Sequence, residues 1–244
     1  MPDPKEDPIG LDERWREQVR PVQRDHLRLY QILGAIAAFV VIVVIAYRAT
    51  PGSNDDFILN AVTEALGVLG TVLIIGSFNA WINDRQYKAD LILQMGSPDN
   101  AFAREAARKL RAKGWLQDGA LQDADLRGAN LHQSSLQRAD LRRVHLRGAN
   151  LTLADFAHAD LSHAELRYAN LDAASLSGTK LYGADLTLAS IRRIYLSGAK
   201  FNEETTLPDG TNWTPDTDMT RFTDPEHPQF WRSDDPNSPA YHQP

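Results

Sequence analysis

A bulky apolar residue occupies every fifth position from Leu116 to Phe201, without a single slip. Two residues before most of these positions stands a small residue, usually alanine, so the repeating unit reads Ala-(Asp/Asn)-Leu-x-x. A period of five fits neither regular element, since it rotates a helical stripe by roughly 500° per repeat and breaks the alternation of a strand. A fixed short repeat is typical of a stacked solenoid. The pattern therefore predicts a square coil in which each unit forms one short strand and a corner.

The large and the small residue of each unit are both predicted to face inward, into a narrow interior. Alanine is needed there because the large residue already fills the space. Val144 and Ile194 stand where the other units have a small residue, which predicts local bulging at these two units. The predicted core residues share the central position of the repeat: Leu121, Leu126, Leu131, Leu136, Leu141, Leu146, Leu151, Phe156, Leu161, Leu166, Leu171, Leu176, Leu181 and Leu186.

This run of repeats, residues 114–201, resembles the pentapeptide-repeat family. The resemblance implies a right-handed four-sided parallel β-helix, with one unit on each side, which we place at residues 115–203. About four and a half coils, spaced ~4.8 Å apart, would form a rod roughly 20 Å long.

Two apolar runs precede the repeats and predict a transmembrane helical hairpin at residues 29–82. The spans are expected at about residues 30–48 and 58–82, each close to the ~20 residues that cross a bilayer. Pro51 and Gly52 lie in the connector between them and indicate a tight turn. A cleaved signal peptide is not favoured, because the polar leader, residues 1–28, is long and carries acidic as well as basic residues.

Positive charge predicts the orientation of this hairpin. Five arginines precede the first run, Arg85 and Lys88 follow the second, and the turn holds only Arg48. By the positive-inside rule, the turn lies outside and both termini are cytoplasmic. The chain is thus expected in the membrane with two spans, and its repeats in the cytoplasm.

The apolar runs contain a few residues that bear on function. Glu64 is either a functional intramembrane carboxylate or a carboxylate near the outer headgroups. Gly34 and Ala38, like Gly67 and Thr71, are small residues four apart, which would permit close helix packing and a homo-oligomer.

Residues 83–114 are predicted to be a cytoplasmic helical linker followed by a cap helix. The second apolar helix could continue through residues 83–95 until Gly96 stops it. Ser97 as N-cap and Pro98 at the first helical position predict a new helix, which reaches Lys113 and is capped by Gly114.

Both ends of a solenoid need covering, because they expose strand edges and an apolar cross-section. Phe102, Ala106 and Leu110 fall on one face of the predicted cap helix and are expected to cover the first coil. At the other end, residues 204–244 are acidic and rich in proline. Their apolar residues predict a loop packed over the last coil at 207–222, whereas the final ten or so residues are expected to be loose. The whole chain is thus predicted to be mainly β: a parallel β-helix preceded by a two-helix hairpin and a capping α-helix.

Composition restricts the chemistry. The 244 residues include no cysteine, so no disulfide, thiol nucleophile or cysteine-ligated metal can be proposed. The net charge is −6, yet the repeats from Leu116 to Phe201 are close to neutral. Most of the acidity lies after residue 201, where acidic residues greatly outnumber arginines.

Residues twenty apart share a column of such a coil, so the outer columns can be read from the sequence. One column and one basic band are candidate partner-binding residues: Arg127, Arg147, Arg167, Arg138, Arg142 and Arg143. They either dock an acidic partner or anionic headgroups, or pair with the adjacent acidic column as a solvated face. Asn130, Asn150 and Asn170 form another column, which predicts an amide ladder along the stack.

The other polar residues give no sign of catalysis or metal binding. His158 and His163 are one unit apart, but no three histidines or acids have ligand spacing. The serines lack a paired base in any known motif, and no glycine-rich phosphate loop occurs. We therefore expect no enzyme activity, metal or cofactor.

The leading interpretation is a membrane-tethered scaffold that presents a rigid cytoplasmic rod to an unknown protein partner. One alternative comes from the resemblance, since some pentapeptide-repeat proteins mimic DNA and bind DNA gyrase, giving quinolone resistance. Such mimicry needs an acidic surface, and the near-neutral repeats argue against it and against a nucleic-acid partner. Another alternative is an accessory subunit of an oligomeric membrane assembly, in which the hairpin carries the function.

Overall fold

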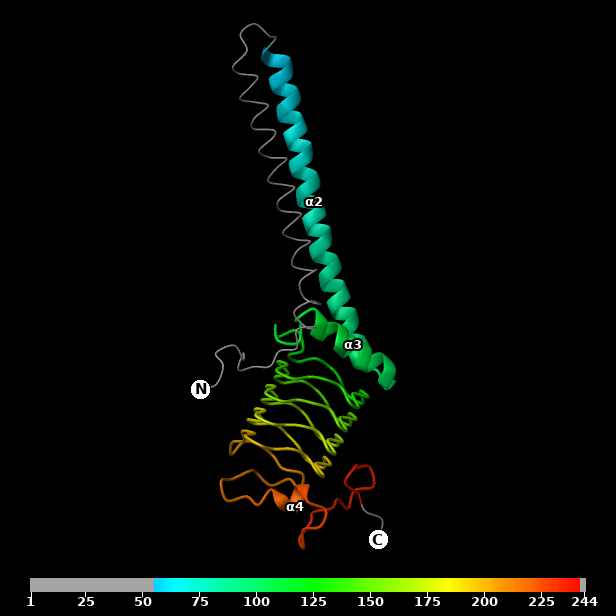
Figure 1. Cartoon of the computed structure of the whole chain (residues 1–244), viewed down its shortest axis with the longest axis vertical. Helices are drawn as coiled ribbons and strands as arrows, with labels where there is room; N and C mark the ends of the chain where they lie inside the picture. Colours follow the sequence, from blue (N-terminus) through cyan, green and yellow to red (C-terminus); the bar gives the residue numbers. More distant parts are fainter. Residues whose placement is uncertain (1–54, 242–244) are drawn as a thin grey trace, which may run out of the picture. The chain divides into compact units, whose positions relative to one another are not determined.

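The computed structural model describes residues 55–241, and Figure 1 shows their elements. The chain divides into two compact units, residues 1–85 and 86–244, which we describe separately. The predicted polar leader at 1–28, the first span at about 30–48 and most of the predicted turn lie outside the described residues.

The first element described is the helix α2, Asp55–Met95. It continues through residues 83–95, the segment for which the sequence predicts a continuation. Within residues 55–241, one helix is long and apolar enough to cross a membrane, and that stretch is Leu66–Met95. Apolar side chains are exposed along much of it, including Val72 and Ile74.

The helix α3, Asn100–Ala112, begins later than predicted. Its N-cap is Asp99, not Ser97, and one carboxylate oxygen of Asp99 accepts hydrogen bonds from the amides of Ala101 at 2.8 Å and Phe102 at 3.4 Å. The Ser97 hydroxyl instead accepts a bond from the Asp99 amide at 3.1 Å, which places Ser97 in the preceding bend. Asp99 is the N-cap because its carboxylate oxygen reaches two amides of the first turn that have no partner within the helix.

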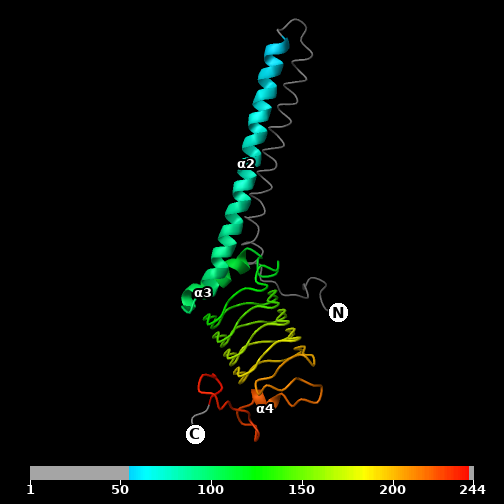
Figure 2. The same cartoon turned by 180° about the vertical axis from the view of Figure 1, so that it is seen from behind.

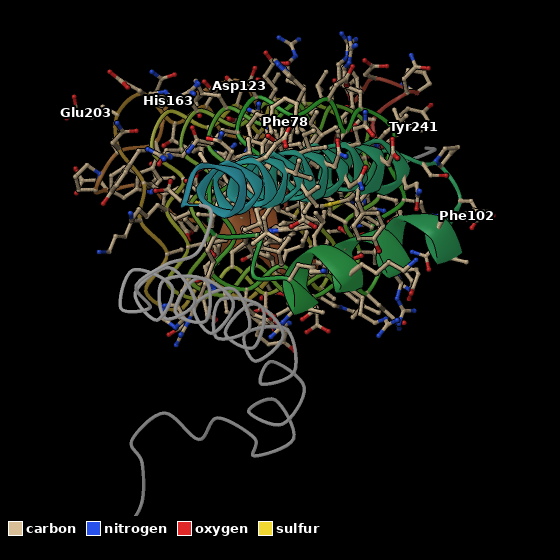
Figure 3. The ribbon with its side chains drawn as sticks, turned by 90° about the horizontal axis from the view of Figure 1, so that it is seen from above. Phe78, Phe102, Asp123, His163, Glu203 and Tyr241 are labelled. Atoms are coloured by element: carbon tan, nitrogen blue, oxygen red, sulfur yellow. The ribbon has the colours of Figure 1, made fainter. Side chains whose placement is uncertain are left out.

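The buried face of α3 also differs from the prediction. It consists of Ala103, Ala106, Ala107 and Leu110, all within the same core cluster as the first coils. Phe102 is 63% exposed and points outward (Figure 3), so its predicted place on the covering face is wrong. The alanines form the i, i+3, i+4 stripe, and such small side chains let the helix approach the coil closely.

Residues 116–201 form a stack of square coils, seen from two sides in Figures 1 and 2. Residues twenty apart pair as parallel β-bridges, for example Asn130 with Asn150 and Asn150 with Asn170. The bridges define four columns, at residues 125–185, 130–190, 135–195 and 140–200. Backbone hydrogen bonds of 2.7–3.2 Å link each coil to the next, as between the Leu151 amide and the Asn170 carbonyl at 2.7 Å. The predicted four-sided parallel coil is confirmed.

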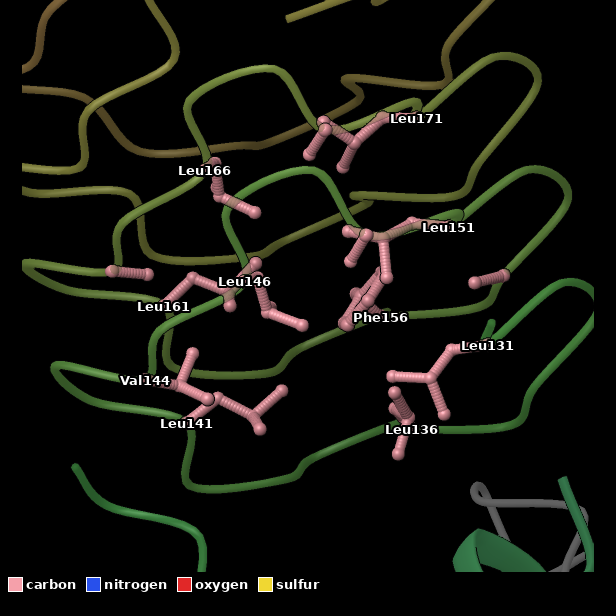
Figure 4. Packing of buried hydrophobic residues seen from close by; sticks show 14 of the residues in the cluster. Leu131, Leu136, Leu141, Val144, Leu146, Leu151, Phe156, Leu161, Leu166 and Leu171 are labelled. Atoms are coloured by element: carbon pink, nitrogen blue, oxygen red, sulfur yellow. The ribbon is translucent and has the colours of Figure 1, made fainter. Parts of the chain in front are cut away.

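All fourteen predicted core residues are at most 2% exposed, and Figure 4 shows the packing of part of this set, including Leu146 and Phe156. Val144 is fully buried in the same interior. Around it the ladder is unbroken, since the Glu165 amide bonds the Val144 carbonyl at 2.9 Å. The predicted bulge at Val144 is therefore absent. Its column neighbours, Ala124 and Ala164, are small and leave room for the extra methyl groups.

The corners of the coils require an unusual backbone conformation. Eleven residues other than glycine have φ between 54° and 60°, among them Leu153 and His158. Several other corners have glycine, such as Gly148 at 68° and Gly178 at 67°. Left-handed geometry is costly for residues with a Cβ. It persists here because the ladder bonds on both sides of each corner fix the path of the chain.

The repeat ends after Phe201, where Asp185 pairs with Thr206 and so moves the register by one residue. Trp213 stacks on Phe201, with ring centroids 5.7 Å apart. The following chain contains the one-turn helix α4, Thr220–Thr223. Leu207 and Phe222 are buried in the core cluster, so this part of the chain packs on the last coil as the sequence predicts.

The chain up to residue 241 is held against the coils, which corrects the prediction of a loose end for the described part of the final ten or so residues; residues 242–244 lie outside the described residues. The Tyr168 hydroxyl donates a hydrogen bond to the Asp235 carboxylate at 2.9 Å. The Ser238 hydroxyl donates to the Leu188 carbonyl at 2.8 Å. These contacts are polar, and a prediction based on apolar residues misses them.

Candidate functional site

The predicted arginine column, Arg127, Arg147 and Arg167, lies on one corner of the rod, directly after the column at residues 125–185. Arg127 makes two hydrogen bonds to the Asp125 carboxylate, at 2.8 and 2.6 Å. Arg167 approaches Asp185 at 3.7 Å. Arg147 lies over the Tyr168 ring, 5.4 Å from its centroid. Each guanidinium thus has a neighbour within the rod.

The predicted basic band shows a similar arrangement. Arg142 holds the Asp140 carboxylate with two bonds of 2.8 Å, and Arg143 holds Asp123 at 2.7 and 2.8 Å. Arg138 is exposed and makes no ion pair within residues 55–241.

The six candidate arginines do not form a single patch. They occupy three of the four corners, because the corner after the 135–195 column holds Arg138, and the next holds Arg142 and Arg143. Around one coil the band runs over successive corners instead of lying on one face. A flat partner could contact one corner at a time, and the Arg127, Arg147 and Arg167 column is the longest such strip.

The arginines favour the ionised form of the carboxylates that they pair with. Hydrogen bonds from Arg127 lower the pKa of Asp125 to about 2. Arg143 likewise lowers the pKa of Asp123, and Arg142 lowers the pKa of Asp140. Exposed pairs of this kind contribute little to stability. Asp125 does balance the charge of Arg127, and Asp123 and Asp140 balance two arginines of the band, so an acidic partner has to compete with these carboxylates of the rod itself.

The asparagine column has a structural role. The Asn150 side-chain amide donates to the Asn130 side-chain oxygen at 3.1 Å, and Asn100 of α3 donates to the Asn130 carbonyl at 3.1 Å. The Asn170 oxygen instead accepts from the Asp172 amide at 3.0 Å. The predicted ladder therefore has one side-chain rung, with α3 bonded at its end.

Sequence reasoning missed the role of the Asp/Asn position of the repeat. Its side-chain oxygen accepts a hydrogen bond from the amide two residues later, as Asp155 does from Ala157 at 2.9 Å and Asp185 from Thr187 at 2.9 Å. Asp and Asn favour this local bond, which mimics a backbone turn. The frequent occurrence of Asp and Asn at this position was the signal, because these side chains support the corner that follows.

The polar side chains show no catalytic or metal-binding arrangement in the part of the chain described. No group of three or more His, Asp and Glu side chains there could hold a metal ion. His158 and His163 each lie over a glycine of the next coil, Gly178 and Gly183. The buried Ser134 hydroxyl has no hydrogen-bond partner. The Thr179 hydroxyl, at the same inward position of its own repeat unit, donates a hydrogen bond to a carbonyl of the coil before it. Before the coil that contains Ser134 the chain forms the helix α3 instead of another coil.

Two cavities lie at the ends of the rod, and the periodicity of the sequence does not predict them. One, of about 470 Å³, is lined by α3 and the first coil and contains Arg104, Arg108 and Arg111. The other, of about 400 Å³, lies between the last coils and the C-terminal segment. Both arise from chain that packs against the ends of the repeat.

Comparison with solved structures returns pentapeptide-repeat proteins. The Rfr23 protein of the cyanobacterium Cyanothece 51142 is 33% identical; the match covers 35% of this chain and 62% of that one, with a TM-score of 0.31. The protein alr5209 of Nostoc PCC 7120 is 29% identical, with 41% and 82% covered and a TM-score of 0.35. QnrB1, a plasmid-mediated fluoroquinolone resistance protein, is 16% identical, with 35% and 57% covered and a TM-score of 0.23. This chain spans about three fifths of the length of the first of these proteins.

Family comparison gives a direct match. No curated protein matches the sequence. The model of pentapeptide repeats matches residues 120–156 and 154–193, with eight copies. These residues carry the period of five, the filled interior and the four columns described above. The repeat region of this chain, residues 120–193, thus belongs to the pentapeptide-repeat family and is a right-handed β-helix.

Proposed function

We propose that this protein is a non-enzymatic, membrane-tethered scaffold whose β-helix presents a rigid surface to a protein partner in the cytoplasm. The observation that carries the proposal is the combination, in one chain, of an apolar helix with exposed side chains and an unbroken rod. Neither part contains a recognisable reaction centre among the described residues.

The rod suits recognition without conformational change. Its core is continuous, and each coil is bonded to the next along all four columns. A surface that is already ordered loses little conformational entropy on binding. Leu153 and Tyr195 are exposed on it and could add apolar contacts to a polar interface.

The lipid bilayer is the partner proposed for α2. Val68, Val72, Ile75 and Phe78 are each more than half exposed, which would be costly in water. Trp81 lies near the end of this stretch, and the Arg85 guanidinium lies 4.7 Å from its ring centroid. Tryptophan and arginine are typical of the membrane–water interface. Together with the first apolar run, α2 would form the two-span hairpin with both termini in the cytoplasm.

The segments on either side of the repeat are proposed to cap the rod. The α3 helix contributes four buried residues to the core cluster, and its Asn100 bonds the carbonyls of Asn130 and His132. At the other end, Leu207 and Phe222 cover apolar surface. Capped ends prevent end-to-end association of solenoids, so the sides of the rod are left for partners.

The arginine strip formed by Arg127, Arg147 and Arg167 remains the candidate site for the protein partner. A DNA-mimic role towards gyrase is not favoured, because the surface pairs arginines with carboxylates instead of presenting acid alone. An accessory role in an oligomeric membrane assembly would require the hairpin to assemble without the rod.

Crosslinking and mass spectrometry in native membranes test the proposal. We expect the wild type to capture one specific protein, and an Arg127/Arg147/Arg167→Glu variant to lose it. A Lys180/Lys200→Glu variant, altered on another column, is the control and should retain the partner. Capture unchanged by the arginine variant would remove the strip as the site. Capture of only further copies of the chain would refute the scaffold and favour the oligomeric assembly.

A further inference from the structure

The cavity between the last coils and the C-terminal segment has the features of a ligand site. Its walls are Ala173, Arg192 and Arg193 from the coils, and Phe230 and Arg232 from the segment after the repeat. Its volume, about 400 Å³, lies in the range of small-molecule sites. We propose that this cavity binds a small phosphorylated ligand with a planar ring, of the class of nucleoside monophosphates. This site is independent of the scaffold role.

The charge of the cavity favours an anion. Arg192 is held by the Asp172 carboxylate through bonds of 2.9 and 2.5 Å, so these two charges cancel. Arg193 and Arg232 are exposed and make no ion pair in the part of the chain that the structure describes. The cavity thus offers two free guanidinium groups, whose planar forks match phosphate oxygens.

This positive charge stands out because the C-terminal segment is otherwise acidic. Only Arg221 and Arg232 are basic there, among many carboxylates. Arg221 is paired with Asp209 at 3.1 Å, whereas Arg232 faces the cavity without a carboxylate partner. An acidic segment that contributes its one unpaired arginine to the same cavity as Arg193 produces a local anion site against the surrounding field.

The aromatic residues of the cavity favour a planar ring on the ligand. Phe230 and Tyr241 line it and are both half-buried. The Arg232 guanidinium lies 5.8 Å from the Phe230 ring centroid. Aromatic faces stack on planar groups, and a stacked ring positions the attached phosphate near the guanidinium groups.

The walls are held in place without a ligand. The Arg193 amide donates to the Thr223 carbonyl at 2.7 Å, and the Trp231 amide to the Arg221 carbonyl at 2.7 Å. The bond from Ser238 to Leu188 fixes the segment that leads to Tyr241. A preformed site loses less entropy on binding.

The cavity beside α3 is a weaker candidate. Its Arg108 is neutralised by Glu105, through bonds of 2.7 Å, and its Arg111 donates to Ser135 and Gln137. No aromatic residue lines it. It therefore lacks both the stacking surface and much of the free charge.

Calorimetric titration of the full-length protein in detergent micelles tests the site, with AMP, adenosine and inorganic phosphate as separate probes. We expect AMP to bind at one site and more tightly than either adenosine or phosphate alone. Arg193→Gln and Arg232→Gln should each weaken AMP binding by about tenfold or more, since each removes a charge-assisted hydrogen bond.

Arg138→Gln is the matched control. Like Arg193, Arg138 is an exposed corner residue with positive φ and no ion pair within residues 55–241. The Arg138→Gln variant should bind AMP like the wild type. Absence of AMP binding by the wild type overturns the proposal. So does equal binding of phosphate or adenosine, or an equal loss in the control. Because the two arginines lie on different segments, a folding defect in one variant leaves the other as the test.

Discussion

The corner at Gly178 provides a quantitative test of how the coils stack. Its φ is 67°, and a Cβ added there would lie 2.5 Å from Nδ1 and 2.8 Å from Cε1 of His158, which belongs to the preceding coil. Gly148 has φ of 68°, but an added Cβ would meet no atom within 4 Å. Gly178→Ala and Gly148→Ala therefore share the conformational cost and differ in the contact with the histidine.

The two costs can be separated. Alanine in the left-handed region costs about 1–2 kcal/mol relative to glycine, and both variants should lose this amount. Non-bonded heavy atoms prefer about 3.5–4.0 Å, so at Gly178 the imidazole or the backbone has to shift by about 1 Å. His158 is exposed, so its ring can turn away from the new methyl group, at the cost of about 0.5–1.5 kcal/mol for a side chain forced off its preferred rotamer. The free energy of unfolding should thus fall by about 1.5–3.5 kcal/mol in Gly178→Ala.

Guanidinium-induced unfolding of the full-length protein in detergent, followed by circular dichroism, measures these differences. The variant His158→Ala removes the ring, so in the double variant the extra cost of Gly178→Ala should disappear. If Gly178→Ala costs no more than Gly148→Ala, or if His158→Ala gives no relief, the stacking of the histidine over the glycine is refuted.

Three further predictions concern the core, the surface charges and the end of the chain. Leu151→Ala, at a fully buried position, should lower the free energy of unfolding by about 2–5 kcal/mol, whereas Leu153→Ala, 49% exposed, should change it by less than about 0.5 kcal/mol in the same assay. The lowered pKa values of Asp123, Asp125 and Asp140 make their stabilisation complete above about pH 4 and lost as the pH falls towards 2, so the free energy of unfolding should fall slightly over this range, as expected for exposed pairs, and Asp125→Asn should weaken this dependence; a stability that rises on acidification would contradict it. Tyr168→Phe, which removes the bond to Asp235, should speed amide hydrogen exchange in residues 231–241 and leave the coils unchanged; equal exchange would show that the bond does not hold this segment.

The repeat was predictable because its constraint is local and repeated. A large residue every five positions, with alanine two before it, leaves a single interior that both can share, and Leu121 to Leu186 are buried as predicted. The pairing of residues twenty apart in the sequence was predictable from the same five-residue period. The bulge expected at Val144 was wrong because a rule about one unit ignored the small neighbours in the adjacent coils.

The regions outside the repeat were less predictable, because their contacts join residues distant in sequence. The local path of the chain places Asp99, and not Ser97, at the N-cap position of α3. Phe102 points outward because the alanines of the helix pack closer to the coil. Asp235 and Ser238 bind Tyr168 and Leu188, far away in the sequence. The candidate arginines illustrate a further limit: spacing gave their columns but not their carboxylate partners.

The absence of cysteine in the chain allows a direct test of the membrane-tethered scaffold. Single variants Ser53→Cys, in the stretch predicted to form the outer turn, and Ser197→Cys, exposed on the rod, can be labelled in intact cells with a membrane-impermeant maleimide. The account predicts that Ser53→Cys is labelled in intact cells and that Ser197→Cys is labelled only after the membrane is opened. Labelling of Ser197→Cys in intact cells, or a protein that alkaline carbonate removes from the membrane, would contradict it.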